Sequence, residues 1–195
     1  MKKHILFTII ILSFTLHFQS AFGKEFDLAQ FTNLRMEYAK SDNYSPNWEN
    51  NEKREKIFEL LQNEKINEAL EASYEWLKQY PFDAEIHMIC SFILRDRWQF
   101  RESINHEFAA RGLIASIASS GDGTSLESPF KVISVGEEYV LLRSLGAKVK
   151  KQSVLSSPSG IMCDMMECEI KGKKVVFYFD VSISMAAINK MLLKK

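Results

Sequence analysis

The pattern of hydrophobic and polar positions divides the chain into a helical first part and a β-rich last part. Between residues 26 and 119, apolar side chains recur every three or four positions, the spacing typical of amphipathic helices. Pro81 interrupts this periodicity, because the residue before a proline avoids the helical conformation, and Asp83 is a suitable N-cap for the helix that follows. We therefore expect helices over residues 26–40, 47–62, 66–79, 83–95 and 98–119.

The pattern changes after a loop of Ser, Gly, Asp and Thr at residues 119–125. Short runs with β-like composition follow, together with one short helix that Gly146 closes. The expected strands cover residues 130–135, 147–155, 162–170 and 174–181, and the expected helix covers 137–145. Residues 184–193 form either a closing helix or a frayed tail. The fold class is α+β, with tetratricopeptide-like N-terminal helices packed on a small, mostly antiparallel C-terminal sheet.

A pattern in the helical part recurs farther along the chain at a constant offset. Residues 66–70 (INEAL) are echoed by residues 100–104 (FRESI), and further similar pairs share the offset: Phe58 and Phe92, Leu60 and Leu94, Tyr74 and Phe108, Tyr80 and Ile114. The offset equals the period of the tetratricopeptide repeat, about 34 residues, a helix-turn-helix unit that mainly holds other chains. The alternative is an ordinary run of four helices. Two repeats bury their own faces poorly, so we expect residues 24–119 and 120–195 to form one compact body.

The match to the repeat is partial. Ala69 supplies the small residue that two packed helices need, and Pro81 follows at the distance expected of the closing proline. In the second copy the small position is Ser103, and no proline closes that copy.

The segment at residues 1–23 has the features of a signal peptide. Lys2 and Lys3 precede an apolar run at residues 5–18, and residues 21–23 (AFG) offer a small-x-small cleavage pattern. The run is short for a membrane span, so no stable span is expected after cleavage. The alternative is an uncleaved N-terminal anchor. We expect the protein to be periplasmic or secreted.

Charge and cysteine content argue against a nucleic-acid-binding protein and against a protein held together by disulfides. The chain carries 25 basic and 25 acidic residues, and loss of Lys2 and Lys3 with the signal peptide leaves it slightly acidic, so nucleic acid is not an expected partner. Cys163 and Cys168 are five residues apart on an expected strand, which spans roughly 16 Å. A disulfide needs Cα atoms within about 7 Å, so Cys90, Cys163 and Cys168 predict no disulfide framework.

The loop at residues 121–127 (GDGTSLE) is the densest candidate for a ligand site. Glycines permit close approach by a ligand, and two carboxylates and two hydroxyls could hold a cation or a sugar. The candidate ligand-binding residues are Asp122, Gly123, Thr124, Ser125 and Glu127. The alternative is that the loop only connects a helix to a strand, with Asp122 capping its own turn.

Metal and catalytic motifs are incomplete. His106-Glu107 begins like a zinc-protease helix, but position 110 is Ala, and His87 belongs to the preceding expected helix. The sequence has no Gly-x-Ser-x-Gly elbow and no Cys-x-x-Cys pair. We therefore predict no catalytic residue, no metal and no cofactor, which favours a binding module over an enzyme.

Three aromatic residues on or beside the repeat helices are candidate partner anchors: Trp76, Tyr80 and Trp98. Packing in the core is the alternative for each. A peptide or helix of an envelope protein would lie in the groove of the helices at 47–62 and 83–95.

Four stretches carry a family resemblance: residues 41–44 (SDNY), 81–87 (PFDAEIH), 120–125 (SGDGTS) and 130–139 (FKVISVGEEY). The chain resembles a family of exported bacterial proteins described as a domain of unknown function. That family pairs a tetratricopeptide-like hairpin with a short β-region entered through the Gly-Asp-Gly loop, and the likeness covers most of residues 41–181. The resemblance implies fold and export, without an activity.

The leading functional hypothesis is thus an interaction module of the cell envelope whose partner is an unknown protein or peptide. A second hypothesis is an enzyme, or a glycan- or cation-binding protein, that uses Asp122 and Glu127 as acid and base or as ligands. A third is an immunity-type protein that blocks a toxin.

Overall fold

The computed structural model describes residues 27–46, 51–157 and 160–193. Its helical part contains α2 (Leu28–Tyr38), α3 (Glu52–Gln62), α4 (Ile66–Gln79), α5 (Ala84–Asp96) and α6 (Phe100–Ala118). The predicted helices are confirmed, and α4 has the predicted bounds. The predicted signal peptide at residues 1–23, and the predicted start of the second helix at residues 47–50, lie outside the described residues.

The C-terminal part is a four-stranded mixed sheet with two helices. Its elements are β1 (Phe130–Lys131), α7 (Val135–Ser144), β2 (Lys148–Ser156), β3 (Met162–Ile170), β4 (Lys173–Asp180) and α8 (Ser182–Leu192). The strand order is β1-β4-β3-β2, in which β1 pairs with β4 in parallel and the other pairs are antiparallel. The α+β fold class is confirmed, and the segment after β4 is a helix.

The predicted strand at residues 130–135 is wrong in its length. The strand β1 ends at Lys131, and Ser134 instead caps α7, because its side chain accepts a hydrogen bond from the Glu137 backbone N–H at 3.2 Å. A Ser in the N-cap position satisfies a backbone donor that a helix leaves open at its start. The β-branched run Val132–Ile133 gave a strand signal, and the Val132 N–H still donates to the Asp180 carbonyl of β4 at 3.3 Å, but the chain then turns into α7 with both side chains buried in the core.

The turns that end α3 and α5 have the same backbone geometry, in agreement with the repeat in the sequence. Glu64 and Trp98, which are separated by the same offset as the echoed segments, both have positive φ, at 59° and 62°. In each turn the next residue donates a backbone hydrogen bond across the helix end: Lys65 N to Leu60 O, and Gln99 N to Leu94 O, both at 2.9 Å. These are Schellman closures, which use a left-handed residue to satisfy the last carbonyls of a helix.

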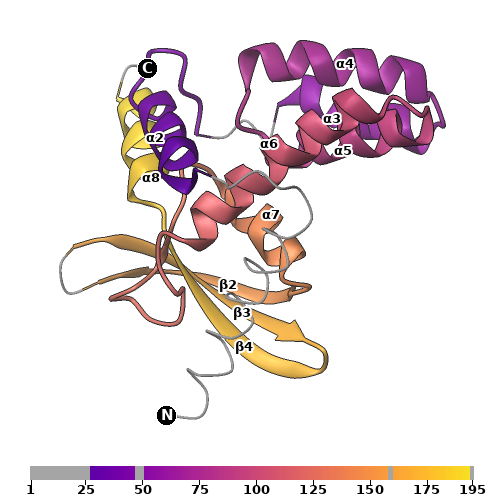
Figure 1. Cartoon of the computed structure of the whole chain (residues 1–195). Coiled ribbons are helices and arrows are strands. Elements are labelled where there is room, and N and C mark those ends of the chain that lie inside the picture. Colours follow the sequence, from indigo (N-terminus) through magenta and orange to yellow (C-terminus); the bar gives the residue numbers. More distant parts are fainter. Residues whose placement is uncertain (1–26, 47–50, 158–159, 194–195) are drawn as a thin grey trace.

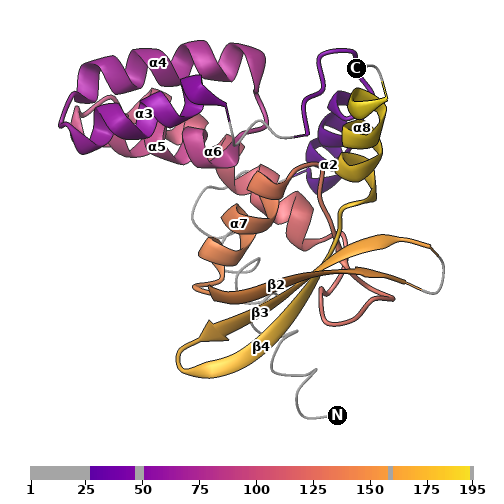
Figure 2. The ribbon, with the colours of Figure 1, turned by 180° about the vertical axis from the view of Figure 1, so that it is seen from behind.

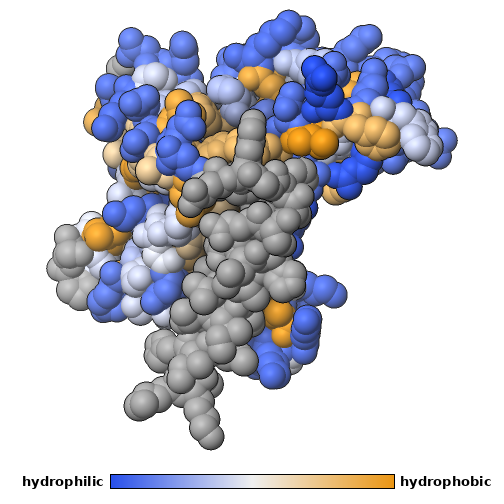
Figure 3. Space-filling model, in the orientation of Figure 1, coloured by the Kyte–Doolittle hydropathy of each residue, from blue (hydrophilic) through white to orange (hydrophobic). Residues whose placement is uncertain are grey.

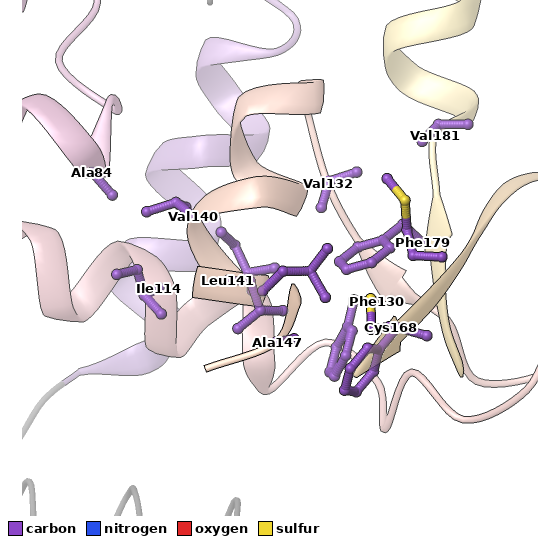
Figure 4. Packing of buried hydrophobic residues seen from close by; sticks show 14 of the residues in the cluster. Ala84, Ile114, Phe130, Val132, Val140, Leu141, Ala147, Cys168, Phe179 and Val181 are labelled. Carbon is purple, nitrogen blue, oxygen red and sulfur yellow. The ribbon is translucent and has the colours of Figure 1, made fainter. Parts of the chain in front are cut away.

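The helices and the sheet share one core. Figure 4 shows Leu141 of α7 between Ile114 of α6 on one side and Phe130 and Phe179 of the sheet on the other, and all four are buried in one hydrophobic cluster. A second cluster lies mainly among α3, α4 and α5, and it also includes Ile133 from the segment between β1 and α7. Figure 1 shows these three helices, with the first turns of α6, as an arm that projects to one side of the body, and Figure 2 shows the same arrangement from behind. We call this projection the helical arm.

The tyrosine of the SDNY stretch ties two distant segments together. Its hydroxyl donates a hydrogen bond from Tyr44 to the backbone carbonyl of Ile133. The start of the arm is thereby held against the segment between β1 and α7. No described helix is long and apolar enough to cross a membrane.

Candidate functional site

An exposed hydrophobic surface lies on α5, α6 and the turn between them. Trp98 is 80% exposed, Phe92 56%, Phe100 50% and Ile104 45%. We call these four residues the arm-end patch. Figure 3 shows hydrophobic colour extending along the arm toward its free end. Single exposed apolar residues are ordinary on a protein surface, whereas a group of large ones marks an interaction site.

The four side chains are held side by side by the helical hairpin. The rings of Trp98 and Phe100 meet edge to face at 5.7 Å between centroids. Phe100 and Ile104 are one helical turn apart, so they share a face of α6. On α5, the Arg95 guanidinium lies 5.9 Å from the centroid of the Phe92 ring.

A charged network borders the patch on the side nearer the body. Arg95 and Arg111 both donate to Glu107, each at 2.6 Å. Glu107 follows Ile104 by three positions on α6, so the network continues the same helical face. Two guanidinium groups share one carboxylate, which leaves one net positive charge at this border.

Trp98 occupies a backbone position that rarely carries a bulky residue. Its φ of 62° lies in the left-handed region, which costs a residue with a Cβ about 1–2 kcal/mol relative to glycine. Glycine is the usual residue at this position of a Schellman closure. Glu64 has the same geometry in the first hairpin, so the turn itself accounts for the backbone conformation. The large, exposed ring at this position is the feature that points to an interaction site.

Trp76 and Tyr80, the other two predicted anchors, lie in the core of the arm. Their rings stack at 4.1 Å between centroids, and both are buried. The Trp76 indole N–H donates to the Asp83 carboxylate at 3.0 Å. Of the three aromatic candidates, only Trp98 therefore presents its ring to solvent, and core packing accounts for the other two.

The polar groups of the Gly-Asp-Gly loop form hydrogen bonds with one another. Asp122 Oδ1 accepts hydrogen bonds from both the backbone N–H and the hydroxyl of Thr124, each at 2.8 Å. The Ser125 hydroxyl accepts from the backbone N–H of Glu127 at 3.3 Å. Asp122 and Glu127 are exposed. The structure thus places the five predicted ligand residues in one surface loop, with the Asp122 carboxylate capping its own turn.

The backbone conformation and the close packing at position 123 require glycine. Its φ is 64°, and a Cβ added there would lie 2.1 Å from the Phe130 ring. The Gly123 N–H donates to the Ser128 carbonyl at 2.8 Å, and its carbonyl accepts from the Tyr178 N–H of β4 at 2.9 Å. The loop is therefore fixed to the edge of the sheet by its backbone.

A buried carboxyl pair lies between α7 and the sheet. Glu138 is fully buried, Asp164 of β3 is nearly so, and the two carboxyl groups are close enough to affect each other's titration. Gln152 of β2 donates to Asp164 Oδ2. Burial raises the pKa of Asp164, and the hydrogen bond from Gln152 offsets part of this rise.

Two histidines form a second titratable pair, between α5 and α6. The Nδ1 atoms of His87 and His106 lie 2.9 Å apart, and His87 Nε2 lies 3.1 Å from the Pro81 carbonyl oxygen. That carbonyl only accepts, so His87 carries its proton on Nε2, and His106 donates from Nδ1. Burial, followed by the neighbouring His87, lowers the pKa of His106 to about 4. In the part of the chain that the structure describes, no three His, Cys, Asp or Glu residues form a metal site, and Cys90, Cys163 and Cys168 are buried free thiols.

A comparison with protein families places the chain in a known family. Residues 21–190 match the family described as a domain of unknown function (DUF4919), so the chain belongs to that family. The charged and apolar segment at residues 1–20 precedes the matched region. No curated protein and no solved structure matches the chain.

Proposed function

We propose that the protein is an interaction module that holds another protein through the arm-end patch. The exposure of Trp98 is the main support for the proposal. Its ring is large, the residue is 80% exposed, and its backbone has the positive φ of a position that usually carries glycine. Tryptophan is among the residues most enriched at the energetic centres of protein interfaces. The Asp122 carboxylate is already engaged within its own loop, so the arm is favoured over the loop as the binding surface.

The helical arm supports the same function by its architecture. The two turns at Glu64 and Trp98 repeat one backbone geometry at the offset of the sequence echo, as in a tetratricopeptide hairpin pair. Units of this kind are used mainly to hold other chains. We place the arm in that class as part of the proposal.

We propose further that the module works outside the cytoplasm. The basic start, the apolar run at residues 5–18 and the AFG pattern at 21–23 support export and cleavage. The partner would then be a protein of the periplasm, the envelope surface or the medium.

Site-specific photo-crosslinking in cells that naturally make the protein tests this function. A photoreactive phenylalanine at position 98 is compared with the same group at Lys174, an exposed residue of β4. We expect a discrete protein adduct from position 98 that is absent from position 174 and lost when Ile104→Glu is added. Equal adducts from both positions, or no adduct from position 98, would count against the proposal.

A further inference from the structure

Aligning the two echoed segments shows which residues of α4 correspond to the exposed residues of α6. Ile104 of α6 occupies the position that Leu70 occupies on α4. Leu70 is only 6% exposed and lies in the core cluster to which α5 contributes Ile86 and Ile93. The face of α4 is therefore covered by the helix that follows it, whereas Ile104 has no equivalent cover among the described residues.

The helix α2 covers only the second half of the α6 face. The ring of Phe31 lies 5.7 Å from that of Phe108 and packs directly against Gly112. The first turns of α6, which carry Phe100 and Ile104, remain exposed. The open surface therefore has the length of a short helix and begins at Trp98.

A second copy of this chain cannot continue the helical array from head to tail. Such a stack would place α3 of one copy on α6 of the other. Among the described residues, α3 has no exposed large hydrophobic side chain that could meet the patch. The occupant must therefore bring an apolar face that the first helix of the arm lacks.

The charges around the patch favour an acidic occupant. Arg95 and Arg111 pair with Glu107 at the border of the patch. Helical spacing places exposed Arg101 beside Ile104 and exposed Asp96 beside Phe92, so the described residues give this face three positive and two negative charges. Three positive charges against two negative charges leave one in excess. Glu102 lies on the opposite side of α6 from Phe100 and Ile104 by helical geometry, so it does not offset this excess.

We propose that the arm-end patch binds an amphipathic helix with acidic flanks from another protein, in the place on α6 that α5 takes on α4. Its apolar residues would pack on Phe92, Phe100 and Ile104, with Trp98 at one end. Its carboxylates would meet Arg101 and the Arg95–Arg111 border. This inference rests on the proposed function and specifies the chemistry of the partner.

Two synthetic helical peptides of about four turns test the inference on the chain from residue 24 onward. Both have the same leucine face, and their flanks carry either glutamates or lysines. Fluorescence anisotropy measures the affinity of each labelled peptide. We expect the glutamate peptide to bind at least about tenfold more tightly, with an affinity that falls as salt is added, because exposed charges are screened.

Matched variants separate the patch from the rest of the surface. Ile104→Glu should abolish binding of the glutamate peptide, and Arg101→Glu should reverse part of the preference. Val176→Glu makes the same type of change at an exposed apolar residue of β4 and should leave binding unchanged. Thermal unfolding of each variant shows whether it remains folded.

Three results would overturn the inference: equal affinity for both peptides, binding of neither, or preferential binding of the chain to anionic lipid vesicles through Trp98. If the peptides fail while the position-98 crosslink to a protein persists, the patch is an interaction site for a partner of other chemistry. If both fail, the proposed function fails as well.

Discussion

Arg35 of α2 and Glu137 of α7, which are far apart in the sequence, form a two-pronged ion pair inside the protein. Arg35 Nε donates to Glu137 Oε1 at 2.8 Å, and Arg35 Nη2 donates to Oε2. The guanidinium also donates to the Ser116 hydroxyl and the Lys131 carbonyl, each at 3.1 Å. One fully buried arginine thus joins α2, α6, β1 and α7.

We expect Arg35→Met to destabilise the fold by about 3–5 kcal/mol, because it leaves the Glu137 carboxylate buried without its counter-charge. Chemical denaturation measures this loss. Lys78→Met removes a partner from the exposed Lys78–Glu75 pair and should change stability by less than about 1 kcal/mol. Similar losses in the two variants would show that the buried pair does not hold α2 in place.

Asp164→Asn should stabilise the protein at neutral pH and alter the pH dependence of its unfolding. Burial raises the pKa of Asp164 above its ordinary value of 3.8. The folded state therefore binds a proton more tightly than the unfolded state, and stability falls as pH rises from about 4 through the raised pKa. Asparagine removes this dependence. The check is the melting temperature from acidic to neutral pH, where parallel curves for the two proteins would contradict the expectation.

Gly123→Ala should destabilise the protein by about 2 kcal/mol or more, since the new methyl group would overlap the Phe130 ring as well as strain the backbone. Gly146→Ala is the matched control. Gly146 also has positive φ, at 68°, but nothing lies within 4 Å of the added Cβ. Its loss should be limited to the backbone cost of about 1 kcal/mol. Equal melting temperatures for the two variants would mean that the ring contact contributes nothing.

Trp98→Gly should separate binding from stability. Glycine relieves the left-handed strain at φ 62°, so folding stability should be unchanged or rise by up to about 1 kcal/mol, while partner binding is lost. Glu64→Gly relieves the equivalent strain in the first hairpin and should leave binding intact. A clear loss of stability in Trp98→Gly alone would show that the indole supports the arm instead of a partner.

Local signals were enough to place most elements from the sequence. The apolar spacing from Ile66 and the stop at Pro81 predicted α4, and Asp83 caps α5 as expected, with its carboxylate accepting from the Ile86 N–H at 3.3 Å. Ser134 was misassigned to a strand. Its β-branched neighbours Val132 and Ile133 favour a strand locally, whereas Ser134 begins a helix and the two neighbours are buried by the tertiary fold.

The site was predictable only in part. Trp98 was a candidate, but sequence spacing did not separate it from Trp76, because a tryptophan on a repeat helix suits either the core or a surface. The correspondence between Leu70 and Ile104 in the sequence echo was the signal that could have identified the open face of α6. No local pattern indicates that Glu137 pairs with Arg35 across the chain, since that pairing exists only after the elements are packed.

The helix α6 belongs to both halves of the molecule. Near its start, the Ser103 hydroxyl donates to the Ser91 carbonyl of α5 at 2.9 Å, and farther along Leu113, Ile114 and Ile117 enter the core beneath the sheet. Its 19 residues are uninterrupted, which makes it a rod of about 28 Å. One helix therefore takes part in both packings. The direction of the arm follows from how the second half of α6 packs against the body, and Trp98 is presented just before the first turn of the same helix.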